Sequence, residues 1–414
     1  MDELFVLVCA ALVFLMQAGF KCVEVGMVRE KHMVSVAMKN LIDWSVTTIV
    51  FYFIGYGFMF GTGPLSGLLG LSEFYPELSS SISGGLNKGV FLLFQMAFAG
   101  TTVTIVSGAM SERTGFVPYL TASIFCVGFI YPVMGHWAWG GLAGEAGSGW
   151  LEDLGFYDFA GSTVVHSTGA WISLAGLKLL GPRIGRYDEH GNPKPLKHYN
   201  IAYTVLGVLL LWLGWWGFNG GSMLKFSFSV IEVIINTNIA GAMGCLASYF
   251  HCKYVQNGED IYDKLIGGAL GGLVGITASA NIQSPATSVV IGIVSGIVHN
   301  YAFDLLSKKW KVDDAVGAIA VHGFCGATGT LLVVLAPKGD FDILRQFFVQ
   351  LVGVLACLVW SATTAWIMFR MLRKTVGLRV SPQEEREGIS IFNVSESPEE
   401  PEDEEIEELL RQMR

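Results

Sequence analysis

The stretches DFAGSTVVH (158–166) and DAVGAIAVH (314–322) align with each other without gaps. Each begins with Asp, has Gly three residues later and ends in Val-His. Each also stands at the start of a long apolar run of the chain. The match predicts that one structural unit occurs twice, with an acid and a histidine at equivalent places.

The sequence around the two stretches predicts an all-α membrane protein. Of the 414 residues, 52% are hydrophobic and only 15% are charged, against about 25% charged residues in soluble proteins. This composition excludes disorder for most of the chain, collagen-like repeats and a disulfide scaffold. A helix needs about 20 apolar residues to cross a bilayer. Eleven transmembrane helices are expected, over residues 3–26, 40–60, 88–110, 116–136, 158–180, 199–220, 228–251, 263–280, 286–306, 314–336 and 344–372.

The predicted spans give the repeat an inverted arrangement. The second copy opens the fifth span after the one that the first copy opens, so the two cross the membrane in opposite directions. Such inverted repeats usually place the functional site near the midplane. Eight helical residues rise by about 12 Å, within a core that is about 30 Å thick. We therefore expect His166 and His322 to meet near the middle of the membrane, in a pore or in proton handling.

The basic residues predict the orientation of the chain. With the N-terminus outside, the inner connections and the C-terminal tail hold 21 Lys and Arg residues, and the outer connections hold 4. This bias places the C-terminus in the cytoplasm. The first span begins Met1-Asp2-Glu3 and is expected to be retained, since it lacks the positive start of a signal peptide. Near its inner end, Lys21 and Glu24 are expected to reach the interface and contact each other, with a pore role as the alternative.

Several motifs carry a resemblance to a known family. Together with DFAGSTVVH, they are FQMAFAGTTVTIVSGAMSER (94–113), GHWAWGG (135–141), GPRIGRYD (181–188), GWWGFNGGS (214–222), VHGFCGATG (321–329) and GLRVSPQEEREG (377–388). In this order the chain resembles the ammonium transporter/Rhesus protein family, up to about residue 390. The resemblance implies two inverted five-helix halves, a long eleventh helix and a homotrimer with one pore per subunit.

The resemblance also implies a role for individual residues in an ammonium channel. These are an outer substrate-binding site at Phe98, Trp139 and Ser222, a gate at Phe98 and Phe218, a pore-lining Trp215, the paired histidines His166 and His322, and a buried Asp158 that orders the outer site. The chemistry suits ammonium, because aromatic faces attract cations and a hydrophobic pore penalises any bare cation. Ammonium can shed its proton and pass as ammonia, and two histidines can hold or relay that proton.

Two other functional classes are weighed against a pore. An enzyme of the Ser-His-Asp type is disfavoured, because the sequence contains no GxSxG motif. A bis-histidine haem protein would be excluded by a colourless preparation. The seven cysteines are scattered through apolar stretches and are expected to be core residues. We therefore expect no enzyme activity, no cofactor and no metal site, and no basic face for nucleic acid.

The C-terminal tail keeps a third alternative open. The chain is expected to divide into a transmembrane domain (1–376) and a cytoplasmic tail (377–414). From Ser381 onward there are 12 acidic and 3 basic residues. Residues 404–414 show an amphipathic helical pattern, which fits either a frayed tail or a connector to a fused signalling domain. With a connector, the body would be an ammonium sensor with little or no transport. The resemblance also allows a cytosolic PII-type regulator at the inner mouth.

Overall fold

The computed structural model describes residues 1–65, 67–144 and 148–390. Within these ranges the chain is helical, and its only strand-like pairings are three isolated β-bridges. The amphipathic helix predicted over residues 404–414 lies outside the described residues.

Helical segments follow one another along the chain and coincide with the predicted spans. Their bounds are α1 (Asp2–Met27), η1 (Glu30–His32), α2 (Met33–Val50), η2 (Phe51–Gly55), α3 (Tyr56–Phe60), α4 (Lys88–Ala109), α5 (Phe116–Phe125), η3 (Cys126–Ile130), α6 (Tyr131–Trp139), η4 (Gly140–Ala143), α7 (Trp150–Leu154), η5 (Ser162–Ser167), α8 (Thr168–Leu180), α9 (Ile201–Gly221), α10 (Ser229–Val255), α11 (Ile261–Thr277), α12 (Pro285–Asp304), η6 (Leu305–Lys309), η7 (Ile319–Phe324), α13 (Cys325–Leu331), η8 (Leu332–Leu335), α14 (Ile343–Thr375) and α15 (Pro382–Glu387).

Eight helical stretches in the described residues are long and apolar enough to cross a membrane. The predicted spans 158–180, 263–280 and 314–336 coincide with the remaining long segments, which are η5 with α8, α11, and η7 with α13 and η8. The length and apolar character of these helices identify a multi-pass membrane protein.

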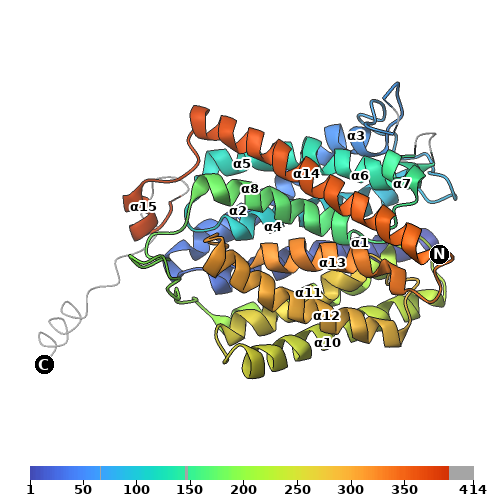
Figure 1. The fold of residues 1–414 in the computed structure, drawn as a ribbon. Helices are drawn as coiled ribbons and strands as arrows, with labels where there is room; N and C mark the ends of the chain where they lie inside the picture. The colour runs from blue at the N-terminus through green and yellow to red at the C-terminus, as the bar shows by residue number, and fades with distance from the viewer. Residues whose placement is uncertain (66, 145–147, 391–414) are drawn as a thin grey trace, which may run out of the picture.

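The helices lie side by side, and α14 runs obliquely across α8 (Figure 1). Helix α1 packs along α9, while α10 packs against both α11 and α12. The short segments η5 and η7 contact each other inside this bundle. The N-terminus and α15 lie at opposite ends of the molecule (Figure 1).

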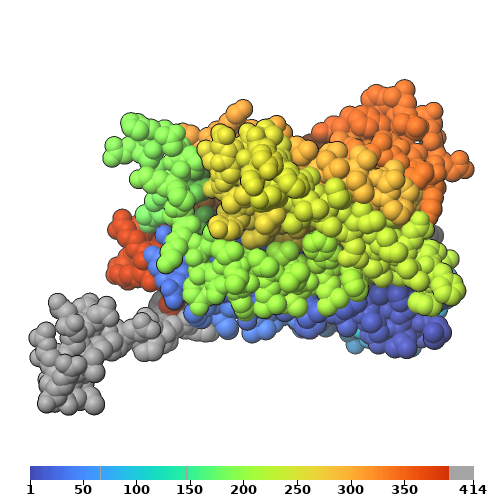
Figure 2. All heavy atoms as spheres, turned by 90° about the horizontal axis from the view of Figure 1, so that it is seen from below, coloured from blue at the N-terminus to red at the C-terminus, as the bar shows by residue number. Residues whose placement is uncertain are grey.

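The outer faces of several helices are apolar and exposed. Figure 2 shows a face of the molecule over α9 and α10. Among the exposed side chains of these two helices are Leu209, Leu213, Ile231 and Phe250. Large exposed apolar side chains on these helices are unfavourable in water and are suited to contact with lipid or with another membrane helix. The cysteines are mostly internal, as expected, since six are buried and Cys245 is half-buried.

The expectation that Glu24 reaches the interface is wrong. Lys21 is exposed, whereas Glu24 is only 2% exposed and points into the bundle. Asn40 Nδ2 and Ser107 Oγ each donate a hydrogen bond of 3.0 Å to the Glu24 carboxylate. A buried carboxyl group needs such partners, and α2 and α4 supply them.

Candidate functional site: a column of rings

A cavity of about 300 Å³, called the outer cavity after the predicted orientation of the chain, collects residues from distant parts of the sequence. Phe98 on α4, Trp139 at the end of α6 and Ser222 just after α9 all line it. The rings of Phe98 and Trp139 lie 6.2 Å apart in an edge-to-face arrangement. The structure therefore brings together the three residues that the resemblance assigns to the outer site.

Phe98, which lines this cavity, stacks against the ring of Phe218. The centroids of Phe98 and Phe218 lie 4.0 Å apart, with an interplanar angle of 15°. Both side chains are buried. Rings at this distance are in van der Waals contact, so no molecule fits between them in this conformation.

The two histidines continue the column below the phenylalanines. The ring of His166 stacks against Phe218 at 5.3 Å and against Trp215 at 5.2 Å. Nδ1 of His166 lies 3.2 Å from Nδ1 of His322. Trp215 is held in place because its Nε1 donates a hydrogen bond of 2.9 Å to Thr277 Oγ1. Rings thus succeed one another without a break from Trp139 to His322.

Asp158 determines how the segment that carries His166 begins. Its carboxylate accepts hydrogen bonds of 2.8 to 3.0 Å from the backbone N–H groups of residues 161–164. Its backbone carbonyl accepts a hydrogen bond of 2.7 Å from Trp139 Nε1. Gly161 has a φ of 107°, and a Cβ there would lie 2.5 Å from Val165 Cγ2. Only glycine adopts this turn without strain.

The second copy of the repeat is built in a similar way. Asp314 accepts hydrogen bonds from the N–H groups of Val316 and Ile319, at 3.3 and 2.7 Å. Gly317 has a left-handed φ of 71°. The histidine-bearing segments η5 and η7 are both π-helical, a rare geometry that is concentrated at functional sites.

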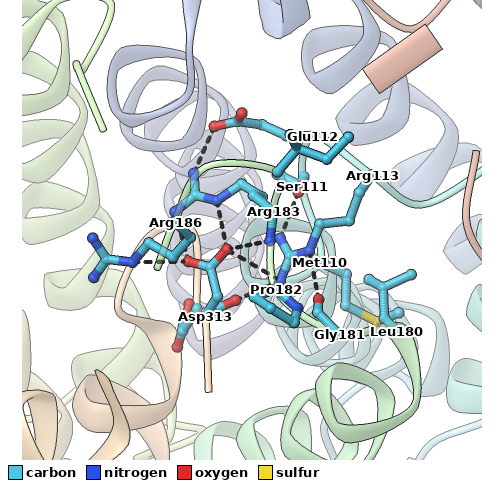
Figure 3. A network of polar contacts seen from close by, with 12 residues as sticks. Met110, Ser111, Glu112, Arg113, Leu180, Gly181, Pro182, Arg183, Arg186 and Asp313 are labelled. Atoms are coloured by element: carbon cyan, nitrogen blue, oxygen red, sulfur yellow. Dashed lines mark hydrogen bonds and ion pairs between the residues drawn. The ribbon is translucent and has the colours of Figure 1, made fainter. Parts of the chain in front are cut away.

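A charged network fixes the chain just before Asp314 (Figure 3). Arg183 lies at its centre, with Nη1 2.6 Å from Glu112 Oε1 and Nη2 2.8 Å from Asp313 Oδ1. Arg113 is fully buried and donates a hydrogen bond to the backbone carbonyl of Asp313. The network joins the connection after α4, the connection after α8 and the start of the second copy of the repeat.

The network is held in its ionised form. Burial alone would raise the pKa of Glu112, but Arg183 and Arg29 outweigh burial and lower that pKa to about 2. Burial would also raise the pKa of Asp313. Arg183 and Arg113 outweigh this effect, so the pKa of Asp313 lies below its ordinary value. The carboxylates therefore keep their charge through the physiological pH range.

The segment that follows α14 folds back onto this network. The Gly115 N–H donates to the Leu378 carbonyl at 3.2 Å, and the Val380 N–H donates to the Arg113 carbonyl at 3.0 Å. The buried Glu385 accepts a hydrogen bond of 2.7 Å from the Ile184 N–H. Leu378, Val380 and Glu385, which belong to the predicted cytoplasmic tail, are thus hydrogen-bonded to the connections of the helical bundle.

Two residues that position the site were not predicted from the sequence. Thr277 orients Trp215, but no feature of the sequence distinguishes it from other threonines in apolar runs. Asp313 precedes Asp314 directly, and its pairing with Arg183 spans 130 residues. Two adjacent acids at the start of an apolar run are unusual, and this pattern is the sequence feature that could have indicated a role for Asp313.

Comparisons with known proteins place these features in a family context. The model of the Ammonium Transporter Family matches residues 4–398. The ammonium transporter Amt2 of Archaeoglobus fulgidus is 36% identical over 94% of this chain and 86% of its own length.

Solved structures agree with the sequence comparison. A structure titled "Sensor Amt Protein" is 39% identical, with a TM-score of 0.91 over 96% of this chain and 98% of its own. Mep2 of Saccharomyces cerevisiae is 27% identical, with a TM-score of 0.83 over 92% of this chain and 88% of its own.

Proposed function

This chain belongs to the ammonium transporter family, and we propose that it carries ammonium across a cell membrane along the column of rings. The observation that supports this most strongly is the continuity of the column, from the outer cavity through Phe98 and Phe218 to His166 and His322. We infer the substrate from the family and the route of transport from the column of rings.

Ammonium is first held in the outer cavity. The faces of Phe98 and Trp139 attract a cation by about 0.5–2 kcal/mol, depending on how far it is desolvated. The hydroxyl oxygen of Ser222 offers a lone pair, because its proton is donated to the Phe218 carbonyl at 2.9 Å. Asp158 does not bind the ion directly in this proposal, since its carboxylate is used by four backbone N–H groups.

The gate then selects for a species that can become neutral. Phe98 and Phe218 part transiently, and a bare cation that enters the apolar section loses hydration worth several kcal/mol. Potassium cannot avoid this cost. Ammonium avoids it by releasing a proton and continuing as ammonia.

The histidine pair receives that proton. In the 3.2 Å contact, one Nδ1 must donate and the other must accept. One Nε2 of the pair therefore carries a lone pair and the other carries a hydrogen. A proton that binds to the free lone pair can leave from the far Nε2, so the two rings act as one relay.

Assembly and orientation complete the proposal. The protein forms a homotrimer with one pore per subunit, in the plasma or inner membrane, with the N-terminus outside and the C-terminus in the cytoplasm. The exposed apolar faces supply the surfaces that pack together or contact lipid. A cytosolic PII-type regulator is a further partner at the inner mouth.

Uptake into liposomes tests the transport function. Purified protein should take up ammonium or methylammonium faster than protein-free liposomes, and potassium should not enter. Uptake no faster than in protein-free liposomes would contradict transport.

Sensing is the second candidate, because the chain matches a "Sensor Amt Protein" over 98% of that chain. A sensor would bind ammonium in the outer cavity and pass the signal through the segment after residue 377 to a signalling module, with little or no flux. The ligand must then stabilise one arrangement of the body over another. Spin labels near Leu409 that respond to ammonium in a chain without flux would favour sensing over transport.

A further inference from the structure

A buried carboxylate lies next to the pore but has no part in the ring column. Glu24 shares a polar cluster with Asp43 and Lys39 between α1, α2, α4 and α5, and all three side chains are buried. Tyr119 Oη donates a hydrogen bond to the Asp43 carboxylate. We call Glu24, Asp43 and Lys39 the inner charge cluster.

The inner charge cluster is not neutral when its groups are ionised. Two carboxylates and one ammonium group carry a net charge of −1. Lys39 Nζ donates to the Thr114 carbonyl at 2.7 Å, and the described residues contain no ion pair between Lys39 and either carboxylate. Since an uncompensated buried charge is costly, this site favours the arrival of a cation or a proton.

A small cavity is lined by both Glu24 and His322. It has a volume of about 20 Å³ open to a water-sized sphere, enough for one water molecule or one ion of similar size. Its polar lining comes from Glu24, Thr104 and His322, and the rest of the wall is mainly apolar. His322 is 4% exposed, and no hydrogen bond in the described part of the chain uses its Nε2.

We propose that Glu24 forms an inner cation site, on the side of His322 remote from Phe98, that takes an ammonium ion. Each Glu24 oxygen accepts one hydrogen bond, so each keeps a lone pair. Together with Thr104 Oγ1, and with His322 Nε2 once the relay has released its hydrogen, these lone pairs offer acceptors to an ion that has only donors. The choice of ammonium rests on the proposed function. The site itself also accepts other monovalent cations of similar size.

Crystals of the full chain grown in thallium(I) acetate test the site, because thallium(I) is a monovalent cation that is located by its anomalous scattering. A peak is expected between Glu24 and His322, and added ammonium should weaken it. Glu24→Gln should abolish this peak. The matched control Glu30→Gln makes the same exchange at an exposed position beyond α1 and should retain it.

Gly108→Ala provides a second variant that keeps the carboxylate. A Cβ at residue 108 would lie 3.2 Å from Glu24 Cγ and 2.8 Å from Val316 Cγ2, so it would fill the cavity and should also remove the peak. Absence of the peak in the unmodified protein, or its persistence in Glu24→Gln, would overturn the inner site.

Flux measurements separate this inference from the transport function. In liposomes, Glu24→Gln should lower ammonium flux by about tenfold, the effect of losing one contact to a charged group, while Glu30→Gln should leave it unchanged. An unmodified protein that conducts ammonium but shows no inner peak would contradict the site alone. A protein with the inner peak and no flux would contradict transport alone.

Discussion

Asp158 and Asp314 hold the two histidine-bearing segments in the same manner, each by accepting hydrogen bonds from backbone N–H groups at its start. A negative charge at this place also complements the partial positive charge of the exposed N–H groups. The histidine follows eight residues later in both copies. The position of each imidazole thus depends on a carboxylate that does not touch it.

Replacement of Asp158 by Ala should impair folding and transport together. The change leaves four buried N–H groups without their acceptor, at about 1–3 kcal/mol for each one that finds no water. Thermal melting and liposome uptake of the same preparation check this expectation. Asp158→Asn keeps one acceptor oxygen and should be affected less, and normal melting and uptake in Asp158→Ala would refute the role.

Loss of either pore histidine should reduce selectivity while the protein stays folded. Without one ring, water can fill the space and lower the desolvation cost of several kcal/mol for a bare cation, so the ammonium-to-potassium flux ratio should fall by about tenfold or more. His166→Ala, His322→Ala and the double variant are compared by flux in liposomes.

The double variant should show about the same flux ratio as each single variant, because the effects of residues that act as a unit do not add. His190→Ala is the matched control, since His190 is exposed. Unchanged flux and selectivity in either pore variant would show that the pair does not handle the proton.

Trp139 should contribute to apparent affinity through its ring. Trp139→Leu removes a cation–π contribution of about 0.5–2 kcal/mol, so half-saturation should require about 2- to 30-fold more ammonium. Trp139→Phe is the control, because both variants lose the hydrogen bond to the Asp158 carbonyl but only Leu loses the aromatic face. Equal half-saturation for Phe and Leu would assign the effect to that hydrogen bond.

Glu112 should make stability depend on pH in the acid range. Its pKa falls from an ordinary 4.5 to about 2 in the folded protein, so the charged form is favoured by folding. The stabilisation is complete above pH 4.5 and is lost as the pH falls toward 2. Glu112→Gln should cost about 3–5 kcal/mol at neutral pH, because Arg183 loses a buried partner.

The difference in melting between the unmodified protein and Glu112→Gln should shrink as the pH approaches 2. Glu189→Gln makes the same exchange at an exposed position and should melt like the unmodified protein at every pH. A difference that does not depend on pH would exclude the charge of Glu112 as its source.

The repeat and the apolar runs predict much of the fold and the centre of the site. Spans of about 20 apolar residues are visible because a bilayer requires them, and helical segments coincide with all of them. The contact between His166 and His322 was predicted from their symmetric positions alone. The roles of Phe98, Trp139 and Ser222 came from the resemblance, since aromatic residues are common in membrane proteins.

The pairings between distant side chains were not predicted from the sequence. Glu24 was expected at the interface because its neighbours on α1 do not show that Asn40 and Ser107 face it. The link from Arg183 to both Glu112 and Asp313 joins three connections that are far apart in the chain. Such contacts depend on tertiary packing, which a local pattern of residues does not record.

Two backbone amides report whether residues 377–390 are docked on the body of the protein. The amides of Gly115 and Val380 lie 265 residues apart, yet each is hydrogen-bonded across the same short contact between Arg113 and Leu378. In heavy water, neither amide hydrogen should exchange quickly while the segment is in place, and both should exchange together once it leaves. The exchange of these two hydrogens therefore measures, in the intact protein, how often its C-terminal segment detaches.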